Sequence, residues 1–387
     1  MAEHYSDPDK IHRYSYHGID HSLVDKVLKH WWNRAINLIP RRMHPNAVSL
    51  LGNLGSWASF AILAFLIPVF GPEHSWLFLL AFLLNFFYST MDALDGMQAR
   101  RLKVSGPCGE FIDHWFDTFN VFFIPLGLMT AFPVIPPWLT YLALLSILFN
   151  DWYNYKEVVD TNTLYFAPFS AQEGLVITWI LMIVFWLTGY DFWASSHSSF
   201  GFPPILLLAS IATLGSWILV IPVILRNRKG SGKYAGGMVL SYLPLLWWIL
   251  EAQRMGLSRL FLFLGLFCLG ITGARYAGDL LRHRLFGLDH RAYYLDTGLA
   301  ALILAGFIIL ARLNHLSPEL ALGLGIIVFL VNGLTAMGLQ FFRSLRRIRK
   351  LLGLGIFGPV LNNQPGNIQP GNKQPADNPK TNPGKDN

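Results

Sequence analysis

Acidic side chains and a histidine are concentrated in one short segment, residues 92–117, which reads DALDGMQARRLKVSGPCGEFIDHWFD. Its ionisable candidates for chemistry are Asp92, Asp95, Glu110, Asp113, His114 and Asp117. Apolar stretches of membrane-spanning length flank the segment. Ionised carboxylates in or beside a bilayer are costly unless something compensates them, so a cluster of this size indicates a functional site. A divalent cation is the natural compensator, because Mg²⁺ prefers oxygen ligands.

The spacing of these residues places them on helix faces. Positions three, four and seven apart share one face of a helix. The first stripe consists of Asp92, Asp95, Gly96 and Ala99, and the second of Glu110, Asp113, His114 and Asp117. Two antiparallel helices joined by the short basic loop would bring both stripes together. The alternative is a solvated helix end whose carboxylates pair with Arg100, Arg101 and Lys103, which the hydrophobic location disfavours.

The overall composition indicates the class of protein that must position this site. Of the 387 residues, 53% are hydrophobic and 14% are charged, which is typical of an all-α polytopic membrane protein and not of a soluble one. The two cysteines, Cys108 and Cys268, are far apart and suggest no disulfide framework. The first ten residues are polar and acidic, so we expect no cleavable signal peptide.

Hydropathy predicts ten transmembrane helices of about twenty residues each. The predicted spans are 48–70, 76–95, 111–133, 136–153, 173–191, 203–225, 235–251, 258–279, 292–311 and 320–341. An even number of spans puts both termini on the same side of the membrane.

Basic residues predict which side that is. One side holds Arg41, Arg42, Arg100, Arg101, Lys103, Arg226, Arg228, Lys229, Lys233, Arg282, Arg284, Arg291 and the basic run 343–350. The other side holds only Arg254, Arg259 and Arg312. By the positive-inside rule, both termini and the acidic segment face the cytoplasm. The same asymmetry and attraction to anionic lipid explain the net charge of +7 without a nucleic-acid partner.

The two ends of the chain have simpler patterns. Residues 19–38 place Leu23, Val27 and Trp31 at helical spacing, which predicts an amphipathic helix lying on the membrane. The alternative is a helix packed on soluble protein. From residue 362 onward the chain is rich in Pro, Asn and Gly, and we expect this tail to be disordered.

The acidic segment also matches a family signature. The pattern D-x-x-D-G-x-x-A-R, eight residues, G-x-x-x-D-x-x-x-D is met by Asp92, Asp95, Gly96, Ala99, Arg100, Gly109, Asp113 and Asp117. The chain thereby resembles the CDP-alcohol phosphotransferases. The QARR sequence, the GE-x-x-DH-x-x-D arrangement and the ten helices resemble the choline/ethanolamine phosphotransferase branch. The likeness extends to YSYHGIDHS at 14–22 and HPNAVSLLGN at 44–53.

This resemblance implies an activity and a role for each residue. The expected reaction transfers phosphocholine or phosphoethanolamine from a CDP-alcohol to diacylglycerol and releases CMP. Two ions of Mg²⁺ or Mn²⁺ would be held by Asp92, Asp95, Asp113 and Asp117. The substrate would be contacted by Gly96, Ala99, Arg100, Gly109, Asn46 and Asn53. His114 would be the general base, and Glu110, one turn away, would orient its ring.

The resemblance also predicts the organisation of the chain. Residues 1–45 would form a cytoplasmic segment with the interfacial helix, and residues 46–226 the six catalytic helices. Residues 227–342 would form helices seven to ten, the expected homodimer surface, and 343–387 the basic segment and tail. A eukaryotic protein of this kind would reside in the endoplasmic reticulum or Golgi membrane, and a bacterial one in the inner membrane.

The sequence is compatible with more than one headgroup, acceptor lipid and function. Trp115 and Phe116 stand where this branch tends to have small residues, and Met97 replaces a residue that is often lysine, so choline, ethanolamine and the acceptor lipid are not distinguished. Four aromatic residues are candidates for contacting a quaternary ammonium: Trp115, Trp152, Tyr153 and Tyr155. Other functions are transfer from CDP-diacylglycerol to a small polar alcohol, a polytopic transporter, and an inactive scaffold.

Overall fold

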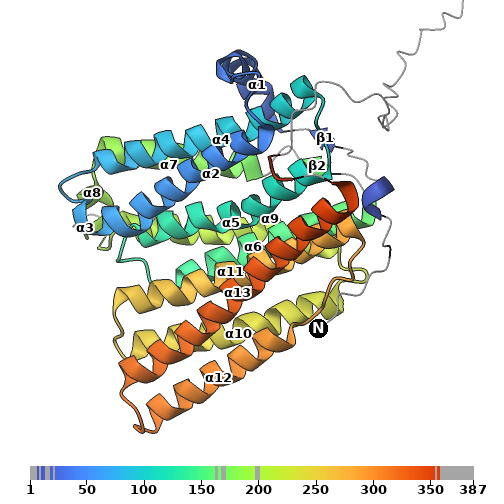
Figure 1. Ribbon diagram of the computed structural model, residues 1–387. Coiled ribbons are helices and arrows are strands. Elements are labelled where there is room, and N and C mark those ends of the chain that lie inside the picture. Colours follow the sequence, from blue (N-terminus) through green and yellow to red (C-terminus); the bar gives the residue numbers. More distant parts are fainter. Residues whose placement is uncertain are drawn as a thin grey trace, which may run out of the picture.

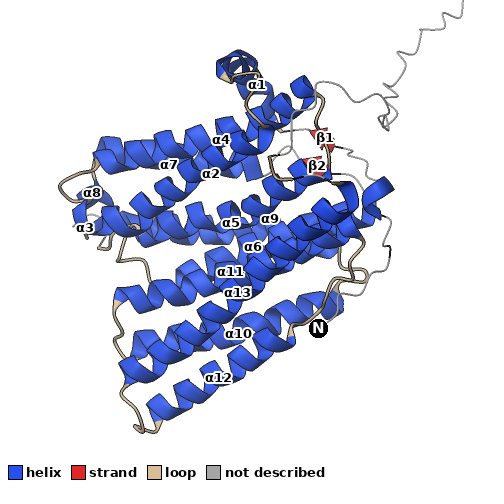
Figure 2. Cartoon of the chain, in the orientation of Figure 1, coloured by secondary structure: helices blue, strands red, loops and turns tan. Residues whose placement is uncertain are grey.

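The protein is a long bundle of helices in the computed structural model, which describes residues 7, 10–13, 18–20, 22–161, 164–166, 171–196, 201–353 and 355–357. Figure 1 shows the helices running side by side, and Figure 2 shows how little other secondary structure accompanies them. The all-α polytopic class predicted from composition is confirmed. The tail predicted to be disordered, from residue 362 onward, lies outside the described residues.

A helix or helical stretch stands at each of the ten predicted spans. The first is α2 (Pro45–Ala61), continued by the π-helical turn η3 (Ile62–Leu66) and α3 (Ile67–Phe70). The others are α4 (Trp76–Leu102), α5 (Pro107–Thr130), α6 (Pro137–Thr161), α7 (Ala171–Thr188), α9 (Pro204–Arg226), α10 (Gly232–Arg254), α11 (Arg259–Phe286), α12 (Leu295–Arg312) and α13 (Pro318–Leu352). The short α8 (Tyr190–Ala194) follows α7. Among the described residues, seven helical stretches are long and apolar enough to cross a membrane, so ten crossings remain a prediction.

The N-terminal segment contains short elements that pack beside the bundle. It comprises η1 (Lys10–Arg13), β1 (Gly18–Asp20), α1 (Leu23–Ala35) and η2 (Ile36–Leu38), and β1 pairs in parallel with β2 (Leu164–Phe166). Glu173 of α7 accepts hydrogen bonds from the Ser22 hydroxyl at 2.7 Å and the Leu23 amide at 2.9 Å, which fixes the start of α1. Leu23 and Val27 are exposed on α1, as expected for an amphipathic helix, and its membrane position stays a prediction.

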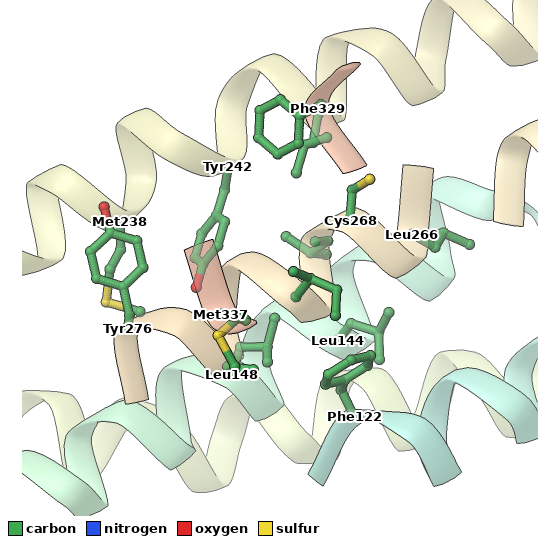
Figure 3. Packing of buried hydrophobic residues seen from close by; sticks show 14 of the residues in the cluster. Phe122, Leu144, Leu148, Met238, Tyr242, Leu266, Cys268, Tyr276, Phe329 and Met337 are labelled. Carbon is green, nitrogen blue, oxygen red and sulfur yellow. The ribbon is translucent and has the colours of Figure 1, made fainter. Parts of the chain in front are cut away.

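The core is built around α11. This helix packs against α5, α6, α10 and α13, and most of its residues from Phe263 to Phe286 are buried. Figure 3 shows its Leu266, Cys268 and Tyr276 surrounded by side chains from those helices, among them Phe122 of α5 and Leu148 of α6. Small residues let helix backbones approach closely in membrane proteins, and the glycines of α11 serve that purpose here.

Turns of the chain bring its basic segments to one end of the bundle. The start of α2, the α4–α5, α9–α10 and α11–α12 connections and the end of α13 all lie at the end that also carries β1 and β2 (Figure 1). The α4–α5 turn begins at Lys103, whose φ of 57° ends α4, and Pro107 then starts α5. This arrangement agrees with the predicted sidedness, in which that end is cytoplasmic.

Candidate active site

The two acidic stripes meet as the sequence predicts. Carboxylate oxygens of Asp92, Asp95 and Asp113 lie within 4.8 Å of one another, and so do ligand atoms of Asp113, His114 and Asp117. Asp113 belongs to both groups. Helix α2 packs against both α4 and α5 and holds the two acidic helices in place. The geometry therefore offers two overlapping groups of oxygen and imidazole ligands at the end of the bundle that is predicted to be cytoplasmic.

Hydroxyl groups of two neighbouring residues orient two of the four aspartates. The Ser49 hydroxyl, on α2, donates a hydrogen bond to Oδ2 of Asp95. The Tyr88 hydroxyl, on α4, donates to Oδ1 of Asp117 across the site at 2.8 Å. Sequence reasoning missed both residues. Tyr88 stands four positions before Asp92, on the same helix face, which is the one local signal that would have found it.

The surroundings of the aspartates fit a divalent cation. Among the described residues, Asp92, Asp95 and Asp117 form no ion pair with lysine or arginine. Arg101 instead donates to the backbone carbonyls of Ile36 at 3.0 Å and Ile39 at 2.7 Å. The alternative of carboxylates paired with the basic loop is therefore not what the chain forms. Clustered carboxylates repel one another unless a cation or proton lies between them, and an all-oxygen set suits Mg²⁺ or Mn²⁺.

His114 lies beside the aspartates, whereas Glu110 forms an ion pair with another helix. The Nδ1 atom of His114 is 3.6 Å from Oδ2 of Asp117 and 3.9 Å from Oδ2 of Asp113. Glu110 pairs with Arg284 of α11 at 2.9 Å, and both side chains are 4% exposed. The predicted general base is thus at the site, and its predicted partner is tied to a helix from the C-terminal half of the chain.

The residues predicted to contact substrate occupy two regions. Arg100 is exposed, and its Nη1 lies 3.5 Å from where a Cβ on Gly96 would stand, which is an ordinary van der Waals distance. A Cβ on Gly109 would lie 3.7 Å from Oδ1 of Asn46. Ala99 is partly exposed on the same stretch of α4. Gly96, Ala99 and Arg100 therefore follow the aspartates along α4, and Gly109 lies beside Asn46.

The two asparagines of α2 are both engaged by protein groups. Asn46 donates to the carbonyl of Ile356 at 2.7 Å, so residues beyond α13 return to the start of α2. Asn53 lies deeper in the bundle and accepts from Asn120 of α5 at 2.7 Å. His44 caps α2 by accepting from the Asn46 amide at 3.2 Å, and burial lowers the pKa of His44, which favours the neutral ring that this cap needs.

Helix α6 adds Asp151, which sequence reasoning missed, and Tyr155, which is one of the four aromatic candidates for contacting a quaternary ammonium. The Tyr155 hydroxyl donates to the backbone carbonyl of His114 at 3.3 Å, and the two rings meet edge to face at 6.4 Å. Asp151 lies one turn earlier on the same helix face. Among the described residues, Asp151 has no hydrogen-bond or ion-pair partner.

Burial separates the four aromatic candidates for headgroup contact. Trp115, Trp152 and Tyr153 are only 2–3% exposed and pack in the core. The six-membered ring of Trp115 would lie 2.7 Å from a Cβ on Gly278, so α11 covers it. Tyr155 is partly exposed and is the one of the four that adjoins His114. Of the four, Tyr155 is therefore the one with exposed surface beside His114.

Comparison with known proteins agrees with this geometry. Residues 42–226 match the CDP-alcohol phosphatidyltransferase family. An uncharacterized class-I member from Schizosaccharomyces pombe is 36% identical over 50% of this chain and 52% of its own length. Choline/ethanolaminephosphotransferase 1 of Arabidopsis thaliana is 28% identical over 61% of this chain and 66% of its own. Cholinephosphotransferase 1 of Xenopus laevis is 27% identical over 48% and 46%.

The chain spans about half the length of most of the curated relatives it matches. The matched region contains α2, α4, α5 and α6, the helices that supply the aspartates, His114, Ser49 and Asp151. The family match, the local motif and the geometry of the site thus fall on the same residues. Residues 42–226 are therefore similar to the CDP-alcohol phosphatidyltransferase family over the helices that form the candidate site.

Proposed function

We propose that the protein transfers phosphocholine or phosphoethanolamine from a CDP-alcohol to diacylglycerol, releasing CMP and forming phosphatidylcholine or phosphatidylethanolamine. The observation that carries this proposal is the pair of carboxylate groups sharing Asp113, with His114 beside them. Relatives named choline/ethanolaminephosphotransferase in Arabidopsis thaliana and Saccharomyces cerevisiae support the choice of donor and acceptor.

The aspartates are the proposed binding site for the diphosphate. Asp92, Asp95, Asp113 and Asp117 would hold two ions of Mg²⁺ or Mn²⁺, which neutralise charge on the attacking and leaving oxygens of an in-line displacement when bound. Gly96, Gly109 and Asn46 border the space beside them, where the cytidine would lie. Arg100 is exposed next to Gly96 and is free to contact a phosphate oxygen.

His114 is the proposed general base. The acceptor hydroxyl oxygen forms a bond to the phosphorus that carries the alcohol, while the bond from that phosphorus to the bridging oxygen breaks and CMP leaves. His114 takes the hydroxyl proton, because imidazole titrates near neutral pH. Its Nδ1 faces Asp117 at 3.6 Å, a contact that stabilises the imidazolium formed in this step.

The headgroup is proposed to carry a positive charge. Asp151 supplies a carboxylate without a protein partner among the described residues, and Tyr155 supplies a partly exposed ring one turn away. A cationic nitrogen is attracted to both kinds of group. Choline and ethanolamine each meet this requirement, whereas a neutral sugar alcohol does not.

Purified protein offered several donors with Mg²⁺ tests the proposed reaction. CDP-choline and CDP-ethanolamine would each be supplied with diacylglycerol, and CDP-diacylglycerol with glycerol phosphate, serine or inositol. We expect CMP release with one or both of the first two donors. Release with CDP-diacylglycerol alone would establish the alternative reaction, and release with none would contradict a transferase.

The proposal extends to the membrane topology and the oligomeric state of the protein. The protein is an integral multi-pass membrane protein, and we propose that both termini face the cytoplasm. We also propose a homodimer through helices α10 to α13, because an open apolar groove of about 640 Å³ runs between α10 and α12, lined by residues that include Leu243, Trp247 and Leu302. Crosslinking through a cysteine at Leu302 tests this surface.

A further inference from the structure

A buried ion pair joins the proposed catalytic helix to the C-terminal half of the chain. Nη1 of Arg284 on α11 lies 2.9 Å from Oε1 of Glu110 on α5, and each side chain is 4% exposed. Among the described residues, Glu110 is the one acid with which Arg284 pairs. A charge buried to this extent is costly unless its partner is held in place, so each group fixes the other.

The packing of α5 on α11 explains why these two residues meet. The two helices run antiparallel, and their contacts occur at successive positions along both helices. Phe122 of α5 lies against Gly270 of α11, and Trp115 lies against Gly278. The rings of Phe111 and Phe286 are 5.8 Å apart at the end of the same row. Both glycines lack the Cβ that would meet an aromatic ring, and this close approach brings Arg284 to the first turn of α5.

Glu110 stands one helical turn before His114, on the same face of α5. The turn that follows Glu110 carries the proposed base and its neighbour Asp113. A contact that fixes Glu110 therefore fixes the part of α5 on which the proposed proton transfer depends. Arg284 lies outside residues 42–226, the extent of the family match, so this contact comes from helices beyond that domain.

We infer that Arg284 is a positioning residue for the transfer reaction, acting on His114 through its buried ion pair with Glu110. The inference rests on the proposed function. Helix α11 then contributes to catalysis as well as to packing. Its Arg284 holds the first turn of α5 in place through Glu110. Arg284 touches no substrate in this assignment and holds the residue that orients the base.

The same helix provides a matched control. Arg282 is buried to a similar degree, lies 3.6 Å from Asp279 and donates to the Ser344 hydroxyl at 3.0 Å. Asp279 lies on α11 and Ser344 on α13. Removing Arg282 therefore tests the loss of a buried arginine from α11 while the pair between Arg284 and Glu110 stays in place.

The experiment measures kcat, KM and metal-dependent CDP-alcohol binding for Arg284→Met, Arg284→Lys and Arg282→Met. Arg284→Met should lower kcat by about tenfold to a hundredfold, the usual effect of losing a group that orients a functional ligand or base. Binding of the CDP-alcohol should be unchanged. Arg284→Lys should recover part of kcat because it keeps a cation near Glu110. Arg282→Met should keep the wild-type kcat even where it lowers thermal stability.

A double-mutant cycle with Glu110→Ala gives the decisive readout. Once Glu110 is absent, adding Arg284→Met should lower kcat no further, because residues that act as one unit are not additive. An unchanged kcat in Arg284→Met, or a full additional loss in the Glu110→Ala background, would overturn the inference. If Arg284→Met does not fold, Arg284→Gln and Arg284→Lys are compared in the same cycle. Absence of CMP release by the wild-type protein would contradict the proposed function instead.

Discussion

The Tyr88 hydroxyl donates a hydrogen bond to Oδ1 of Asp117 at 2.8 Å and thereby links the two acidic helices across the site. Tyr88 is buried on α4, and Asp117 lies on α5, next to His114 in one of the two ligand groups. The hydrogen bond leaves Oδ2 of Asp117 directed toward His114. Asp117 is therefore oriented by protein contacts on both of its oxygens.

Replacing Tyr88 by phenylalanine removes this orientation while keeping the ring. We expect Tyr88→Phe to weaken Mn²⁺ binding by about tenfold to a hundredfold, as is usual when a partner of a metal ligand is lost. Titration of purified protein with Mn²⁺ in the presence of CDP measures the change. Tyr153→Phe is the control, because its hydroxyl lies 3.5 Å from Ser231 and away from the aspartates. Equal Mn²⁺ affinity in the two variants would show that Tyr88 does not support the site.

Substitution of His114 distinguishes a role as general base from a role in binding the metals or the substrate. His114→Ala should lower the transfer rate by about a hundredfold to ten-thousandfold, the range of general-base contributions, while metal-dependent CDP-alcohol binding survives. Glu110→Ala should lower the transfer rate by less, because a misaligned histidine still accepts protons. Single-turnover kinetics and equilibrium binding measure the two effects. Retention of most activity in His114→Ala would favour Asp117 as the base, and loss of binding would make His114 a binding residue.

Asp151 should influence the headgroup and not the metals. Asp151→Asn removes the carboxyl group proposed to contact the cationic headgroup, so the KM for CDP-ethanolamine or CDP-choline should rise about tenfold, the value of one charge-assisted contact. Asp160→Asn, on the same helix and paired with Lys156, is the matched control. The measurement is steady-state KM for each donor. A KM equal to that of the control would remove Asp151 from the headgroup site.

The sidedness of the bundle is open to chemical labelling. Ser105 lies in the exposed α4–α5 turn, at the end that is predicted to be cytoplasmic. After Cys108 is replaced, a cysteine at Ser105 should resist impermeant thiol reagents in sealed vesicles whose cytoplasmic face is inside, and should react once the membrane is opened. A cysteine at Ser258, in the α10–α11 connection at the other end, should react in the sealed vesicles. Rapid labelling at Ser105 in the sealed vesicles would contradict the predicted topology.

Much of the site could be predicted from the sequence because its main contacts are local in the chain. The aspartates and His114 repeat at helical spacing on two helices joined by a short turn, so their meeting follows from periodicity. Ser49, Asp151 and Arg284 could not be found in this way, because each reaches the site from another helix through tertiary packing. The Asn46 contact with Ile356 likewise depends on residues beyond α13 returning to α2.

Helix bounds differ from the predicted spans for a related reason. Hydropathy marks the apolar part of a helix, whereas α4 continues to Leu102 and α13 to Leu352. Both extensions carry basic residues and run past the predicted hydrocarbon region at the predicted cytoplasmic end. The extension of α4 is what places Gly96, Ala99 and Arg100 on the same helix as Asp92, so the catalytic stripe belongs partly to a segment that hydropathy alone does not recognise.

The number of Mn²⁺ ions bound per chain in the presence of CDP shows whether the aspartates form a two-metal site. We expect two ions for the wild-type protein and a loss of binding in Asp113→Asn, because Asp113 belongs to both ligand groups. Turnover should fall with the loss of binding, and Asp191→Asn, at an exposed position of α8, should match the wild type. Two ions bound equally well by Asp113→Asn, or full turnover in excess chelator, would rule out the two-metal site.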